Sequence, residues 1–196
     1  MHQGQGPRRN PRLSPRIAAI HASHAGFGLS PARPDEIAEA RDFAADLIGG
    51  KNVSPDTLAW VHERTGGCLF LAREEGRLTG VWASVLLTDA GVAACHADAF
   101  DALDPDPGHV SKKHQEPAGH YAWGIAGSTR ESARRVVGAA DALFWSVLSH
   151  LPFFTRPATP AGVRLVVERL GFEPVPGSSS GLVWRAPRTD RASVAA

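Results

Sequence analysis

The second half of the chain alternates between strand-like and helical patterns, and this alternation constrains the fold more than any other feature. The segment 120–127, HYAWGIAG, is typical of a strand, and apolar residues then recur at helical spacing over 133–148. A short strand at 153–156 and a further helix at 159–170 follow. Strands that alternate with helices form a sheet covered on both faces. We therefore expect an α/β fold whose centre is a mixed, mostly antiparallel twisted sheet with helices on both faces.

The first half of the chain supplies the remaining elements. A strand is expected at 27–31, followed by two helices, the first starting at Pro34 and the second after Ser54, a favourable N-cap residue. The runs CLFLARE from Cys68 and LTGVWASVLLT from Leu78 surround a Glu-Gly-Arg turn and predict a hairpin. Two short strands close the predicted fold, at 172–175 and 181–185.

Composition separates the two ends of the chain from its middle. Pro, Arg, Ser and Ala dominate 1–25 and 186–196 with little to bury, so both ends are expected to be disordered tails. The apolar patch at 17–20 leaves open a short docked helix within the first tail. Residues 26–185 then form a single domain with an insert at 89–119, in which a polar, proline-broken loop follows an Ala-rich helix. A loop of this length is usually functional or flexible.

Charge and cysteine content exclude several classes of function. The net charge of +1 provides no general attraction to nucleic acid or to an anionic membrane, and no apolar run of about 18 residues predicts a membrane span. The basic N-terminal segment lacks the apolar stretch of a secretory signal. Cys68 and Cys95 are too few for a disulfide framework, which favours a reducing cytoplasm. Among the cysteine and the histidines between Cys95 and His120, only Cys95 and His96 lie close together in sequence. Zinc sites usually show tightly paired spacings, so no metal site is expected.

Three parts of the chain resemble the GNAT acyltransferase superfamily. They are the order of elements over 27–185, the helix and exit GVRLVVERLGFEPV at 162–175, and the strand–turn–helix unit at 119–150. The resemblance implies a GNAT-like fold and transfer of an acyl group from acetyl-CoA or another acyl-CoA to an amine. The acceptor it implies is a small-molecule or peptide amine. Neither nucleic acid nor a membrane is expected as a partner, on the charge and hydropathy given above, and a homodimer is left open.

The same resemblance puts the pyrophosphate of CoA at the helix start within 119–150, where free N–H groups and the helix dipole favour an anion. Two starts compete. The string RVVGAA from Arg135 matches the family pattern literally, whereas Ser128 and Glu131 form a capping box for an earlier start. The apolar face already begins at Ala133, which favours the earlier start. The cofactor-binding residues expected from this register are Ile125, Gly127, Arg130, Glu131, Ser132, Ala133, Arg134 and Arg135.

The sequence indicates the catalytic residues less clearly than it indicates the cofactor-binding residues. Acyl transfer to an amine needs a neutral amine, a positioned thioester and a donor for the oxyanion. The family's helix tyrosine corresponds here to Val167, and the only tyrosine of the chain is Tyr121. His120, at the head of the central strand, is the candidate base because histidine titrates near neutral pH. The leading hypothesis is an N-acetyltransferase; the alternatives are an acyl-homoserine-lactone synthase on the same fold and a non-catalytic acyl-CoA sensor.

Overall fold

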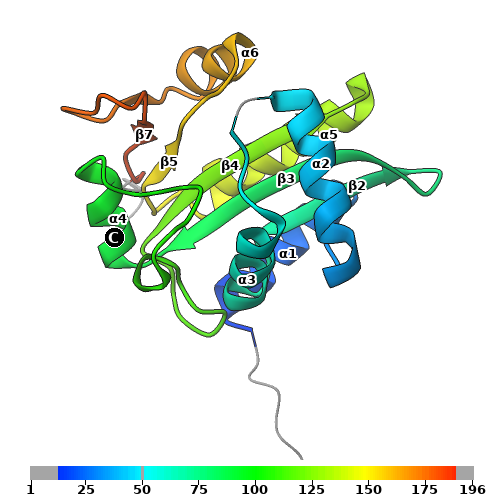
Figure 1. Ribbon diagram of the computed structural model, residues 1–196, viewed down its shortest axis with the longest axis horizontal. Helices are drawn as coiled ribbons and strands as arrows, with labels where there is room; N and C mark the ends of the chain where they lie inside the picture. The colour runs from blue at the N-terminus through cyan, green and yellow to red at the C-terminus, as the bar shows by residue number, and fades with distance from the viewer. Residues whose placement is uncertain (1–12, 50, 189–196) are drawn as a thin grey trace, which may run out of the picture.

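The computed structural model describes residues 13–49 and 51–188. Its strands are β1 (Leu29–Pro31), β2 (Leu69–Glu74), β3 (Arg77–Leu87), β4 (Gly119–Gly127), β5 (Phe153–Thr155), β6 (Glu173–Pro174) and β7 (Val183–Arg185). They form one sheet in the order β1-β2-β3-β4-β5-β7-β6, shown in Figure 1. Neighbouring strands are antiparallel except β4 and β5, which run parallel. The predicted mixed, mostly antiparallel sheet is therefore confirmed.

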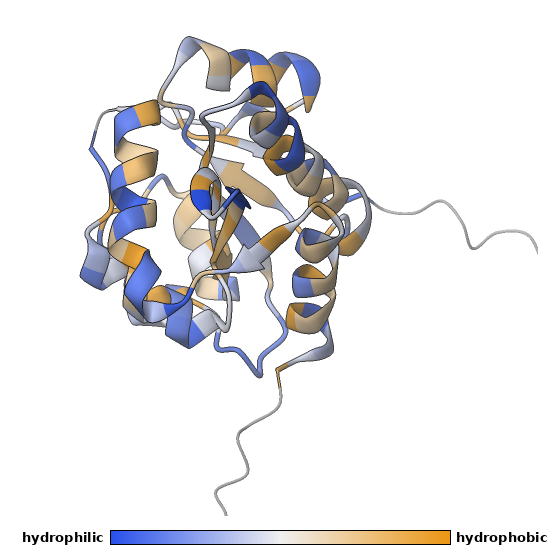
Figure 2. Cartoon of the chain, turned by 90° about the vertical axis from the view of Figure 1, so that its right-hand side faces the viewer, coloured by the Kyte–Doolittle hydropathy of each residue, from blue (hydrophilic) through white to orange (hydrophobic). Residues whose placement is uncertain are grey.

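Helices cover both faces of this sheet. They are α1 (Pro15–Gly26), α2 (Ile37–Ile48), α3 (Pro55–Thr65), α4 (Asp89–His96), α5 (Arg130–Ala142) and α6 (Pro160–Val163). Two π-helical segments, η3 (Leu143–Val147) and η4 (Arg164–Arg169), extend α5 and α6, and short 3-10 turns stand at Pro34–Glu36 and Pro107–His109. Helices α1 and α5 pack on one face of the sheet, and α2 and α3 on the other (Figure 1). Figure 2 shows that the helices are banded in polar and apolar colours, as helices with one buried face must be.

The N-terminal segment differs from its prediction. Residues 15–26 form α1 instead of a disordered tail, with the side chain of Ser14 accepting a hydrogen bond from the backbone N–H of Ile17. Ile17 and Ile20 are buried in the apolar layer between α1 and the sheet. Burial of this patch stabilises a helix that composition alone does not reveal. The domain therefore begins before residue 26, while 1–12 and 189–196 of the predicted tails lie outside the described residues.

The hairpin of β2 and β3 is confirmed. Its turn residues, Glu75 and Gly76, have φ angles of 49° and 80°, the left-handed conformation that two-residue hairpin turns require. The insert at 89–119 contains the expected Ala-rich helix, α4, and the loop after it packs against the sheet. Val110 in that loop pairs with Leu87 at the end of β3. The insert is thus anchored to the central strands.

The parallel pair β4 and β5 determines where a ligand can enter. Only three residue pairs connect the two strands, the last being Ala122 with Thr155. Beyond that pair β4 continues to Gly127 along β3, whereas the segment after β5 turns away from β4 at Arg156 and Pro157. One edge of β4 is therefore left without a neighbouring strand, and the sheet opens at this point.

Candidate functional site

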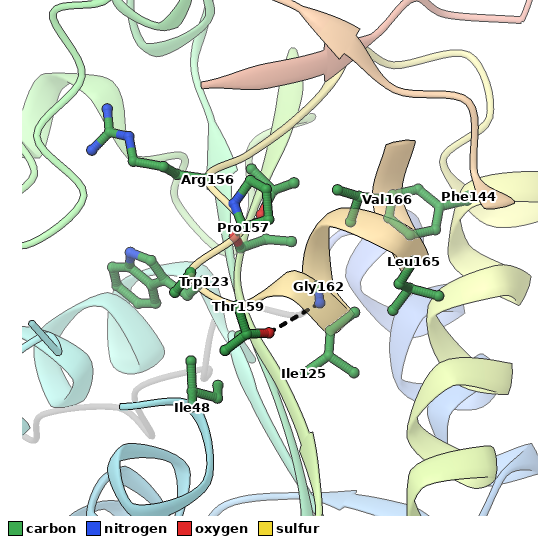
Figure 3. A pocket seen from close by; sticks show the side chains of 14 residues that line it. Ile48, Trp123, Ile125, Phe144, Arg156, Pro157, Thr159, Gly162, Leu165 and Val166 are labelled. Carbon is green, nitrogen blue, oxygen red and sulfur yellow. Dashed lines mark hydrogen bonds between the residues drawn. The ribbon is translucent and has the colours of Figure 1, made fainter. Parts of the chain in front are cut away.

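A cleft occupies the opening between β4 and the segment after β5. In Figure 3, Ile48 reaches it from the end of α2, Ile125 from β4, and Leu165 and Val166 from the opposite wall. Most of the lining is apolar, and the cavity volume is about 100 Å³. The guanidinium of Arg156 is directed away from the apolar side chains. A narrow, apolar channel beside an unpaired strand edge suits a flexible chain such as pantetheine.

The cleft continues in two directions. A cavity of about 270 Å³ shares Ile125 and Leu165 with it and reaches Gly127 and Ala133 at the start of α5. A smaller cavity of about 40 Å³ lies between α2 and the sheet and shares Gly124 with the cleft. We call the cleft and the 270 Å³ cavity together the β4 groove. The groove leads from the separation of the strands to a helix N-terminus, and the smaller cavity provides a second approach to the same point.

The helix at the end of the β4 groove begins at Arg130, which confirms the earlier of the two predicted starts. Its capping residues are one position later than predicted. The hydroxyl of Thr129 accepts a hydrogen bond from the N–H of Ser132 at 3.0 Å, and the Ser132 hydroxyl accepts one from the N–H of Thr129 at 3.1 Å. Ser128 is excluded from this role because its N–H donates to the carbonyl of Thr79 on β3, at 2.8 Å, and so keeps it in the sheet. Glu131 takes no part in the capping box.

The first turn of α5 has the features of an anion site. The N–H groups of Arg130 and Glu131 have no acceptor within the helix. The side chains of Arg130 and Arg134 are exposed and pair with no carboxylate in the described part of the chain. The Glu131 carboxylate on the same turn opposes an anion, as does the Glu74 carboxylate, which accepts a hydrogen bond from the Thr129 hydroxyl at 3.4 Å. The structure thus brings together most of the residues that the sequence assigned to the cofactor turn.

Arg135 is an exception within that set. Its Nε donates to the carbonyl of Phe27 at 3.0 Å and its Nη2 to the carbonyl of Gly28 at 2.8 Å. The side chain therefore connects α5 to the junction of α1 and β1, and its Nη1 lies 3.9 Å from Oε1 of Glu74, the carboxylate bonded to Thr129. Gly138, the glycine of the literal motif, lies inside α5, where an added Cβ would come within 2.7 Å of the Phe27 ring. The string RVVGAA is accordingly a packing surface for the N-terminal helix.

His120 lies in the core and does not line the cleft. It is 1% exposed, with ring centroids 5.8 Å from Trp82 and 4.6 Å from Phe153. Neither ring nitrogen has a hydrogen-bond partner among the described residues, and burial lowers the pKa of His120 to about 3. The ring is neutral and enclosed. It is not placed to receive a proton from an acceptor in the cleft.

The other reactive side chains of the sequence also lie away from the cleft. Burial raises the pKa of Tyr121 to about 12 and that of Cys95 to about 12, and it raises the pKa of the Cys68 thiol further. The polar side chains that do line the cleft make local bonds: Thr155 donates to the carbonyl of Ala122 at 3.0 Å, and Thr159 caps α6 by accepting from Gly162 N–H at 3.0 Å. The described lining contains no carboxylate, histidine, cysteine or tyrosine.

Within residues 13–49 and 51–188, no group of three or more His, Cys, Asp or Glu side chains could hold a metal ion. None of the helices formed by the same residues combines the length and the apolar character needed to cross a bilayer.

Ile48, Leu165 and Gly162 are cleft residues that sequence reasoning missed. Ile48 ends a helix far from β4 in sequence, and only the packing of α2 on the sheet brings it there. Thr159 carried a usable signal, because a Thr-Pro pair before an apolar helix predicts an N-cap. Nothing in the local pattern indicated that this cap would face the cleft.

No protein-family model matches the sequence, and no curated protein matches it. Several solved structures are similar to it, among them the following three. Histone acetyltransferase HPA2 and related acetyltransferase from Corynebacterium glutamicum is 14% identical with a TM-score of 0.47, over 83% of this chain and 97% of that one. The GNAT-like decarboxylase GphF in complex with isobutyryl-CoA is 13% identical with a TM-score of 0.47, over 82% and 99%. Ard1 from Thermoplasma volcanium is 12% identical with a TM-score of 0.46, over 80% and 95%. The similarity is one of fold.

Proposed function

We propose that this chain binds acyl-CoA in the β4 groove and transfers the acyl group to an amine, most simply acetyl from acetyl-CoA. One observation carries the proposal: an apolar groove beside the free edge of β4 leads directly to a helix start with unpaired N–H groups. The pantetheine arm would lie along Gly124 and Ile125. The pyrophosphate would accept hydrogen bonds from the N–H groups of Arg130 and Glu131, with the Arg130 and Arg134 guanidiniums beside it. The GNAT resemblance of 119–150 supports the same placement.

The chemistry that follows is attack by a neutral amine on the thioester carbon. A C–N bond forms, the carbonyl oxygen becomes an oxyanion, and the C–S bond then breaks. Backbone N–H groups on the free edge of β4 are the nearest donors for the oxyanion. The CoA thiolate takes up a proton, and the amine nitrogen loses one to water. The cleft lining supplies no titrating base, so the rate would come from proximity and from oxyanion stabilisation.

The acceptor would approach through the smaller cavity between α2 and the sheet, where Trp123 and Arg41 are among the lining residues. A small amine or the end of a peptide fits this approach better than a folded surface does. A reducing cytoplasm is the setting we propose, because both cysteines are free thiols.

The first test is a thermal-shift titration with CoA, acetyl-CoA and longer acyl-CoAs. We expect saturable stabilisation in the native sequence and a large loss of affinity in Gly124→Val, because a Cβ at Gly124 already lies 3.2 Å from Ile48 Cδ1 and the valine side chain would fill the cleft. Gly26→Ala is the control, since a Cβ there meets nothing within 4 Å. Absence of stabilisation by every CoA species would refute acyl-CoA binding.

A second candidate is a non-catalytic module that binds acyl-CoA. The observation that favours it is the lack of any histidine, carboxylate, cysteine or tyrosine in the described cleft lining. Release of free thiol from acetyl-CoA in the presence of a panel of amines separates the two. Thiol release that is lost in Gly124→Val supports the transferase; stabilisation by acyl-CoA without amine-dependent thiol release supports the binding module.

A further inference from the structure

A second cavity lies between η3, β7 and the segment that follows β7. Its volume is about 330 Å³, and its lining includes Trp145, Leu170, Glu173, Trp184, Arg185 and Arg188. None of its lining residues belongs to the β4 groove. Pockets for small ligands commonly measure roughly 300–1,000 Å³, so this cavity is large enough for a metabolite.

Arg185 is a buried cation with no carboxylate partner among residues 13–49 and 51–188. It is only 9% exposed, and its Nη2 donates to the carbonyl of Phe144 at 3.0 Å. Its Nε and Nη1 are buried and have no hydrogen-bond partner, and it forms no ion pair with any carboxylate among the described residues. A buried guanidinium with two nitrogens that donate to no acceptor destabilises the folded state unless a ligand supplies the acceptor.

Arg188 adds a second positive charge at the same place. The guanidinium carbons of Arg185 and Arg188 lie 4.4 Å and 4.1 Å from the centre of the Trp145 ring, within range of cation–π contact. Burial and the nearby Arg188 charge both lower the pKa of Arg185, which is the effect of two cations held together. The exposed carboxylate of Glu173 lines the same cavity and pairs with neither arginine.

We infer that this cavity is a binding site for a small oxyanion, a carboxylate or phosphate group carried by a metabolite. Arg185 would donate to one oxygen of such a group from Nη1, beside the Nη2 that donates to Phe144, and the ion would strengthen this hydrogen bond by its charge. Arg188 would add charge from the rim, and the half-exposed Trp145 ring would pack on the ligand's apolar part. This cavity and the β4 groove have no lining residue in common, and Phe144, which lines the cleft and accepts the Arg185 bond, lies between them.

The experiment titrates the full chain with inorganic phosphate and, separately, with succinate at constant ionic strength, followed by calorimetry. We expect saturable binding of at least one of them, with affinity at least tenfold weaker in Arg188→Ala. Glu173→Gln removes the opposing carboxylate and should tighten binding severalfold. Arg77→Ala removes the same charge at the exposed β2–β3 turn and should leave the affinity unchanged.

Arg185→Gln should abolish binding, but Arg185 is buried and its variant could fail to fold; Arg188→Ala and Glu173→Gln keep the test decisive because both side chains are exposed. Preference for phosphate or for succinate identifies the ligand class. Binding of neither anion overturns the inference, as does equal weakening by Arg188→Ala and Arg77→Ala. Loss of anion binding in Arg130→Ala would place the anion at the start of α5 and would also overturn it.

Discussion

His24 and His120 are two buried histidines that face the same tryptophan. Their ring centroids lie 5.9 Å and 5.8 Å from that of Trp82. The Nδ1–H of His24 donates to the carbonyl of Ile20 at 3.0 Å, and the described residues offer no other hydrogen bond to either ring. Burial lowers the pKa of His24 to about 4 and that of His120 to about 3. Both rings are therefore neutral in the folded protein at neutral pH.

These two histidines predict a loss of stability in acid. In the unfolded chain a histidine titrates near pH 6.5, so stability is fully present above that pH and falls as the pH drops toward 4 and 3, because only the unfolded chain binds the protons. Each histidine contributes up to about 1.4 kcal/mol per pH unit in this window. His120→Phe should flatten the dependence by that amount in urea unfolding measured between about pH 7 and pH 5. His114→Phe, at an exposed position, is the control; an equal slope in His120→Phe and the native sequence would contradict the prediction.

Gly127 permits a close approach that no other residue allows. A Cβ there would lie 2.5 Å from the backbone nitrogen of Ala133. Gly127→Ala should therefore push the end of β4 away from the start of α5, with a loss of about 1–3 kcal/mol in the free energy of unfolding. It should also weaken acyl-CoA binding. Urea unfolding and thermal-shift titration measure the two effects, and Gly26→Ala, with open space around the Cβ, should show neither.

At the scale of elements, the start of α5 depends on the reciprocal bonds of Thr129 and Ser132. Loss of an N-cap hydroxyl typically costs about 1 kcal/mol, which we expect for Thr129→Ala in urea unfolding. Ser128→Ala is the matched control, since its hydroxyl makes only one bond, to the Thr79 carbonyl at 3.3 Å. A larger effect of Ser128→Ala than of Thr129→Ala would mean that the helix starts one residue earlier.

Arg130 and Arg135 belong to the same helix and should behave in opposite ways. Arg135→Ala removes two bonds to the carbonyls of Phe27 and Gly28, and hydrogen bonds to a charged group contribute about 1.5–3 kcal/mol each. We therefore expect lower stability with unchanged acyl-CoA affinity per folded molecule. Arg130→Ala should weaken acyl-CoA binding several-fold at unchanged stability. The reverse result would indicate that the phosphate binds at Arg135, in the string RVVGAA.

On the scale of the whole molecule, the β4 groove is made by four separate segments: the end of α2, β4, the start of α5 and the segment after β5. Its described lining contains no carboxylate, histidine, cysteine, lysine or tyrosine. The pH dependence of acyl transfer should accordingly follow the acceptor. We expect log kcat/KM to rise with a slope of about one up to the pKa of the amine and to move with that pKa when a less basic amine is used. A break at one fixed pH for all amines would reveal a base on the enzyme.

Local features of the chain were predictable wherever one physical effect dominates. The left-handed turn at Glu75 and Gly76, the Ser54 and Thr159 caps and the helical periodicity after Ala133 all follow from neighbours in sequence. The position of the α5 start within one residue belongs to the same class. The predicted N-cap, Ser128, is one residue too early because its N–H donates to the carbonyl of Thr79 on β3. No pattern in the neighbouring sequence indicates this partner.

The sequence by itself determined the order of elements from β1 onward, the class of sheet and the start of α5 to within one residue, because periodicity, capping and turn conformation act over a few residues. Only the tertiary structure decided that 15–26 dock as a helix, that Arg135 is bound to the chain at Phe27, and that His120 is enclosed with no partner. It also decided that Ile48 meets β4 at the cleft. Those outcomes depend on which faces of distant elements pack together. Burial of apolar surface is the largest favourable term in folding, and which side chains are buried depends on that packing.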